Sequence, residues 1–138
     1  MDNESTLLPM EEGLTREALE NPDTLSKFIV SVLDAKKSRD IKLLHVEKQT
    51  IIADYFVICT GTSRTQIRSL ADEIEFKLER YGITPLHNEG LDTGTWVLQD
   101  YGSVIVHLFN RESRDFYKLE KLYQDTTERD ISELITEE

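Results

Sequence analysis

Residues 96–109 carry the clearest alternation of apolar and polar positions in the chain, and they predict a β-hairpin. Two runs of β-branched and aromatic residues flank the turn at 100–102, which is typical of antiparallel strands joined by a tight turn. Trp96 and Leu98 fall on one face of the first strand, because side chains alternate along a strand. Both faces of the hairpin are partly apolar. One layer of helices would cover one face, so the other face needs a second layer or a partner.

Two segments carry apolar residues at helical spacing. Apolar positions in 25–33 recur at i, i+3, i+4, i+7 and i+8, which predicts a helix with one buried stripe, capped by Asp23 or Thr24. A second helix is predicted after Ser63, whose hydroxyl is a suitable cap. Gln66 lies three residues further on, so it completes a capping box.

The remaining elements are strands at 41–46, 54–60 and 83–87 and a last helix that begins at Asn110. The last helix is expected to bury Phe116, Leu119, Leu122 and Tyr123. The order α-β-β-α-β-β-β-α predicts an α/β (α+β) fold, a mixed sheet of about five strands with helices packed on it.

Negative charge is concentrated at the two ends of the chain. Residues 1–23 hold seven acids and one base and residues 125–138 hold six acids and one base, while the whole chain has a net charge of −11. We interpret 1–23 as an acidic, flexible leader, 24–124 as the folded domain and 125–138 as an acidic tail with a weak helix. The acidic ends either maintain solubility or orient the protein on a basic partner surface.

The sequence favours a cytoplasmic protein. It has no apolar run of about 18 residues that would span a membrane, and its first residues lack the pattern of a secretory signal. Its one cysteine, Cys59, lies in an apolar run and suits a reducing compartment.

Catalytic chemistry has little support in this sequence. His45, His87 and His107 lie on or beside different strands without ligand spacing, so neither a metal nor another cofactor is expected. The main enzyme alternative is nucleotidyl transfer, in which residues 61–63 would cradle a phosphate at the start of the following helix. The nearby acids are Asp72, Glu73 and Glu75. They fall on a helix face rather than converging from strands, so no catalytic residue is assigned.

Protein binding remains the better interpretation of the hairpin. Trp96, Leu98 and Tyr101 are residue types that anchor interfaces, and Asp100 beside them is able to pair with a basic partner. His107 is expected to be hydrogen-bonded at a surface or interface. The alternative that Trp96 and Leu98 are simply core residues stays open. Basic residues are interleaved with acids, which favours at most a peripheral contact with ribosomal RNA.

Several motifs together resemble one known family. They are the runs at 54–58 (DYFVI), 60–63 (TGTS), 71–73 (ADE), 89–90 (EG), 96–102 (WVLQDYG), 106–107 (VH) and 114–122 (RDFYKLEKL). In this order and spacing they resemble the ribosomal silencing factor family, also called Iojap-like. The resemblance covers about residues 24–124, so the two ends inherit nothing from it.

The resemblance implies a factor of the bacterial cytoplasm, with relatives in mitochondria and chloroplasts. Such proteins bind the large ribosomal subunit at large-subunit ribosomal protein fourteen and sterically block joining of the small subunit, chiefly when nutrients are short. The implied fold is nucleotidyltransferase-like but without known catalysis. The implied contact surface includes Trp96, Leu98, Asp100 and Tyr101. Family members are also able to self-associate as dimers, and a homodimer would cover exposed apolar surface in the free protein.

Overall fold

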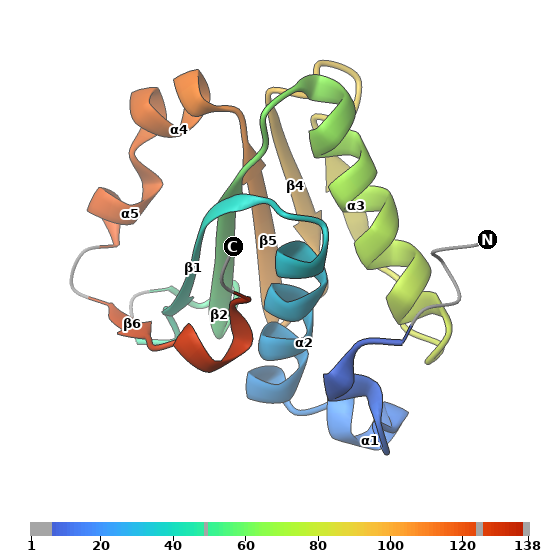
Figure 1. Cartoon of the computed structure of the whole chain (residues 1–138). Helices are drawn as coiled ribbons and strands as arrows, with labels where there is room; N and C mark the ends of the chain where they lie inside the picture. The colour runs from blue at the N-terminus through green and yellow to red at the C-terminus, as the bar shows by residue number, and fades with distance from the viewer. Residues whose placement is uncertain (1–6, 49, 124–125, 137–138) are drawn as a thin grey trace.

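A six-stranded mixed sheet forms the centre of the computed structural model, which describes residues 7–48, 50–123 and 126–136. The strands are β1 (Arg39–His45), β2 (Tyr55–Thr60), β3 (His87–Glu89), β4 (Trp96–Asp100), β5 (Val104–Phe109) and β6 (Thr127–Arg129). Their order is β3-β4-β5-β2-β1-β6 (Figure 1). The β2–β5 pair is parallel and the other neighbours are antiparallel. The predicted α/β class and mixed sheet are therefore confirmed, with one strand more than expected.

Helices cover both faces of the sheet. The longer helices α2 (Pro22–Ala35) and α3 (Arg64–Glu79) lie on one side of the strands, and α4 (Arg111–Tyr117) and α5 (Leu119–Leu122) lie on the other (Figure 1). The short elements are the turn η2 (Pro9–Glu11), helix α1 (Arg16–Leu19) and the turn η3 (Ser132–Leu134). Among the described residues, no helix has the length and apolar character needed to cross a membrane.

The two faces of the sheet have separate hydrophobic cores. Val104, Val106 and Leu108 of β5 join the larger core under α2 and α3. Ile105 and Phe109 belong to a smaller core on the opposite face. This division confirms the alternation predicted for the hairpin. The smaller core, which includes Leu119 of α5, covers the second face of the hairpin.

The predicted cap of the first helix is wrong by two or three positions. Asn21, not Asp23 or Thr24, caps α2, because its side-chain oxygen accepts the backbone N–H groups of Asp23 (2.9 Å) and Thr24 (3.3 Å). Pro22 then occupies the first helical position, where its missing N–H costs nothing. The cap predicted for α3 is confirmed, since the Ser63 hydroxyl accepts the Gln66 N–H at 3.0 Å.

The third strand lies later in the sequence than the predicted 83–87. Ile83 instead completes the end of α3, where its N–H donates to the Leu78 carbonyl at 3.1 Å. Gly82 precedes it with a φ of +76°, as expected of the residue that ends a helix. The strand β3 begins only at His87.

The described parts of the expected leader and tail are folded against the domain. Leu19 is 1% exposed and belongs to the larger core. Glu11 is buried, and it accepts hydrogen bonds from the Tyr81 hydroxyl (2.8 Å) and the Lys77 ammonium (3.2 Å). At the other end, β6 pairs with β1, and η3 replaces the expected weak helix. The boundaries drawn at 23 and 125 and the flexibility expected of the leader remain predictions, while the described parts of both segments contact the domain.

Candidate functional site

Trp96 and Leu98 lie side by side on the face of β4 that is turned away from α2 and α3. Trp96 pairs across the hairpin with Phe109, and Leu98 pairs with His107. Both side chains are only partly buried, and both pack against the smaller core. Each side chain therefore has one side in the core and one side accessible, and its role at an interface stays a prediction.

Aromatic contacts fix the position of the Trp96 indole. Its ring stacks on Phe109 with centroids 4.9 Å apart and contacts Tyr117 of α4 at 4.6 Å. Its Nε1–H donates a hydrogen bond to His107 Nδ1 at 3.2 Å. Such aromatic pairs contribute about 0.5–1.5 kcal/mol each beyond their buried area. The indole is therefore held in one orientation before any partner arrives.

His107 lies beneath this surface rather than on it. Its side chain is 4% exposed, and burial lowers its pKa to about 4, so the ring is neutral near pH 7. Because Nδ1 accepts the Trp96 proton, the ring proton resides on Nε2, which has no hydrogen-bond partner among the described residues. The expected hydrogen bond is present, but its role is to position Trp96.

Asp100 and Tyr101 do not extend the Trp96 surface equally. One oxygen of Asp100 accepts the Gly102 N–H at 2.7 Å, which fixes the hairpin turn, and the other lies 3.7 Å from His87 Nδ1. Tyr101 packs against the larger core on the opposite face, where its hydroxyl donates to Gln99 at 3.2 Å. Burial raises the pKa of Tyr101. Asp100 therefore lies at the rim of the surface, and Tyr101 lies outside it.

Three apolar residues on α4 and α5 are exposed, although two of them, Phe116 and Leu122, were predicted to be buried, and the two on α4 continue the surface. Phe116 is 78% exposed, Leu122 is 75% exposed and Tyr117 is 48% exposed. The Phe116 and Tyr117 rings meet edge to face at 5.0 Å, and Tyr117 reaches Trp96. We call Trp96, Leu98, Phe116 and Tyr117 the aromatic surface. Leu119 alone of the four predicted core positions is fully buried.

The chain breaks at Lys118, between the two helices that carry these residues. Lys118 has a left-handed φ of +49°, so α4 and α5 are separate helices rather than one. Arg114, 4% exposed, holds the two together, because its guanidinium donates to Glu120 on α5 at 2.8 and 3.1 Å. The same side chain donates to the Thr60 hydroxyl at 2.8 Å and to the Asp40 carbonyl at 2.6 Å. Neither Gly nor Pro, the residues that usually mark the end of a helix, occurs in 111–122, so the sequence did not predict the break.

Two backbone N–H groups of the loop at 61–63 already donate hydrogen bonds to other parts of the protein. The Gly61 N–H donates to the Phe109 carbonyl at 2.8 Å, and the Thr62 N–H donates to the Gln66 side chain. A Cβ on Gly61 would lie 2.6 Å from Ile67 Cγ1, so glycine is explained by packing. In the described ranges, no three His, Cys, Asp or Glu side chains form a group suited to a metal ion.

A comparison with known families decides what kind of protein carries this surface. The model of the family described as "Ribosomal silencing factor during starvation" matches residues 19–138. The chain belongs to the ribosomal silencing factor family. The ribosomal silencing factor RsfS of Bacillus subtilis (strain 168) is 38% identical over 111 residues, which cover 80% of this chain and 94% of that protein.

More distant relatives agree with this assignment. A crystal structure of protein CV0518 from Chromobacterium violaceum is 33% identical, with a TM-score of 0.73, and the match covers 75% of this chain and 87% of that one. The mouse protein named "Mitochondrial assembly of ribosomal large subunit protein 1" is 32% identical over 102 residues, 70% of this chain and 43% of its own length. The fold and a role in ribosome-associated silencing follow from this family membership.

For a ribosomal silencing factor, the aromatic surface is the candidate functional site. The family name describes a regulator of ribosomes, which matches a surface built from contact residues rather than from reactive groups. Cys59 agrees with this view, because burial raises the pKa of its thiol to about 12 and a thiol is a poor nucleophile.

Proposed function

We propose that this protein binds the large ribosomal subunit through large-subunit ribosomal protein fourteen and thereby blocks joining of the small subunit in the cytoplasm. The observation that carries the proposal is the aromatic surface, where half-buried Trp96 continues into Tyr117 and the 78% exposed Phe116. Large aromatic side chains that are already held in place are the residues that anchor protein interfaces. Family membership supplies the ribosome as the partner.

The mechanism requires steric exclusion and no chemical step. The two ribosomal subunits join through a large cooperative interface, so a bound protein at one contact point prevents docking. Trp96 and Leu98 supply apolar anchoring, and His107 holds the indole from below. Asp100 at the rim meets a basic side chain of the partner, because its carboxylate retains 21% exposure.

The test compares two phenylalanine variants on opposite faces of the sheet. Phe116→Ala removes an exposed ring of the aromatic surface, while Phe76→Ala removes a 39% exposed ring on α3. Removing an interface anchor costs about 2 kcal/mol, which is roughly 30-fold in affinity. We therefore expect Phe116→Ala, but not Phe76→Ala, to lose co-sedimentation with large subunits and the ability to prevent assembly of the joined ribosome.

Two results would contradict this proposal. One is co-sedimentation of wild-type protein with neither subunit, and the other is an equal effect of the two variants. The same surface is expected to be covered by a second copy in the free protein. Sedimentation velocity would then show a dimer that Phe116→Ala shifts toward monomer, whereas a monomeric wild type would remove the dimer from the proposal.

A further inference from the structure

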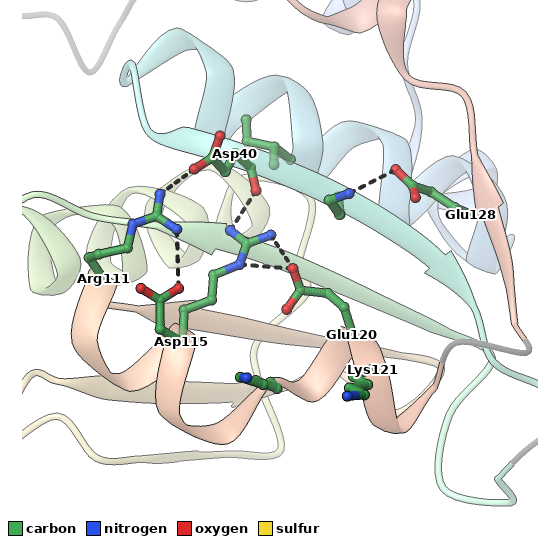
Figure 2. Close-up of a pocket in the computed structure, with 10 residues that line it drawn as sticks. Asp40, Arg111, Asp115, Glu120, Lys121 and Glu128 are labelled. Atoms are coloured by element: carbon green, nitrogen blue, oxygen red, sulfur yellow. Dashed lines mark hydrogen bonds and ion pairs between the residues drawn. The ribbon is translucent and has the colours of Figure 1, made fainter.

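A charged cleft lies on the other side of α4 from the aromatic surface. Its volume is about 800 Å³, and it is bounded by the β1 edge with β6 on one side and by α4 and α5 on the other (Figure 2). The lining residues include Asp40, Arg111, Asp115, Lys121 and Glu128. None of the residues of the aromatic surface lines this cleft, so it is a separate feature of the same pair of helices.

Each acid in the cleft already has a basic partner. The pairs are Asp40 with Arg111, Asp115 with Arg111 (3.6 Å), Glu120 with Arg114 (2.8 Å) and Glu128 with Lys42 (3.6 Å). These pairs are the dashed contacts that cross the cleft in Figure 2. The acids are therefore not available to neutralise further cations.

Two lysines in the cleft remain without such partners. The ammonium groups of Lys118 and Lys121 make no hydrogen bond or ion pair with any residue in 7–48, 50–123 or 126–136, and both side chains are exposed. Figure 2 shows Lys121 on α5 with no contact drawn to its amine. The lining holds five bases and four acids, although the chain as a whole has a net charge of −11. The cleft is thus a locally positive site on an acidic protein.

The backbone holds these lysines in a fixed place. Lys118 adopts its left-handed φ of +49° at the junction of α4 and α5. Buried Arg114 joins the two helices on either side of this junction through Glu120. Lys121 follows within α5, whose Leu119 is buried in the smaller core. The backbone at these two positions is therefore already fixed in the folded protein.

We propose that this cleft binds the phosphate backbone of ribosomal RNA next to the protein contact, through Lys118 and Lys121. The inference rests on the proposed function, because α4 carries Phe116 and Tyr117 on one side and the cleft on the other. A helix docked on the large subunit by its aromatic side brings the cleft to the neighbouring ribosomal surface. Phosphate oxygens are the dominant anions there, and lysines bind them without regard to sequence.

The test measures large-subunit binding as a function of KCl concentration for a double variant and its matched control. Lys118→Gln with Lys121→Gln removes both cleft ammonium groups. Lys36→Gln with Lys48→Gln makes the same charge change at exposed positions at the end of α2 and in the β1–β2 turn. Loss of two phosphate contacts should lower the slope of log Kd against log salt by about 1.4–1.8. We expect this shallower slope, with roughly tenfold weaker binding at low salt, in the cleft variant alone.

A second arm uses isolated large-subunit ribosomal protein fourteen, free of RNA. The cleft variant should bind this protein as tightly as wild type does. Equal weakening in this arm would mean that the cleft meets an acidic protein segment, which overturns the RNA assignment. Subunit binding with an unchanged salt slope would overturn the cleft inference and leave the proposed function intact. No binding of wild type to the large subunit would overturn both.

Discussion

His107 determines the orientation of the aromatic surface from beneath it. Its Nδ1 accepts the Trp96 indole proton at 3.2 Å, and this acceptor exists only while the ring is neutral. Burial favours that neutral state, because it lowers the His107 pKa to about 4. The free energy of unfolding must then depend on pH, since an unfolded histidine has a pKa of about 6.5.

The direction of this dependence follows from proton uptake. Between pH 6.5 and 4 the unfolded chain binds a proton at His107 that the folded protein does not, so acidification favours unfolding. The stability that the neutral, buried ring of His107 contributes is fully present above pH 6.5 and is lost as the pH falls toward 4. From pH 7 to pH 5 we expect His107 to reduce the free energy of unfolding by about 2 kcal/mol, as measured by urea denaturation.

His107→Phe provides the comparison, because phenylalanine cannot take up a proton. The variant differs in absolute stability, so the quantity to compare is the change between the two pH values. All other titrating groups are shared and cancel in this difference. A variant with the same pH response as wild type would show that His107 is not the group responsible.

Alternation along the hairpin predicted some of these residues correctly and left others unresolved. It placed Trp96 and Leu98 on one face, which the structure confirms. The same period of two puts Tyr101 on the opposite face, so the signal that separates it from the surface was already in the sequence. The burial of His107 was not predictable, because it depends on Trp96, Phe56 and the covering α4–α5 layer.

At the scale of elements, the broken helix after β5 is what creates a surface. Helical periodicity in 116–123 predicted a single buried stripe that included Phe116 and Leu122. The turn at Lys118 instead leaves both exposed. The longer helices were predictable because each has one apolar stripe and α3 also has its predicted cap. The break was not, since it depends on long-range contacts of Arg114 with Thr60 and Asp40.

Arg114→Lys tests whether these contacts hold α4 against α5. Lysine keeps the charge but cannot reproduce the fork that donates to Glu120, Thr60 and the Asp40 carbonyl. Impairing a buried ion pair costs about 3 kcal/mol, so we expect a loss of that order in the free energy of unfolding. Chemical denaturation gives the value.

Arg111→Lys is the matched control for that change. Arg111 lies on the same helix, but its side chain is 54% exposed, so its pairs with Asp40 and Asp115 are screened by water. We expect stability close to wild type. Similar losses in the two variants would show that Arg114 acts as an ordinary surface residue and that the helix junction is held by other contacts.

At the scale of the whole molecule, the proposed function assigns different tasks to the two faces of the sheet. The face under α2 and α3 holds the larger core, and the chain ends pack onto it through Leu19 and η3. The opposite face carries the aromatic surface. The packing of the two end segments onto the domain was not predictable from their acidic composition, because a buried acid such as Glu11 looks the same in the sequence as an exposed one.

This division predicts that stability and ribosome binding respond to different substitutions. Burial alone would raise the Glu11 pKa, but hydrogen bonds from the Leu8 N–H, Tyr81 and Lys77 lower it overall, so the carboxylate stays charged at neutral pH. Its pair with Lys77 is buried, with side chains 0% and 3% exposed. Glu11→Ala should therefore reduce the free energy of unfolding by about 3 kcal/mol, measured by denaturation at pH 7.

The folded Glu11→Ala protein should still bind large subunits with wild-type affinity, because Glu11 contacts Lys77 of α3 and the neighbouring Tyr81. Helix α4 lies on the other side of the sheet from α3 (Figure 1). Phe116→Ala should behave in the opposite way. Its ring is mostly exposed, so stability changes little while subunit binding is lost. If Glu11→Ala weakens binding under conditions where the protein remains folded, the N-terminal segment belongs to the ribosome contact, and the assignment of separate tasks to the two faces is wrong.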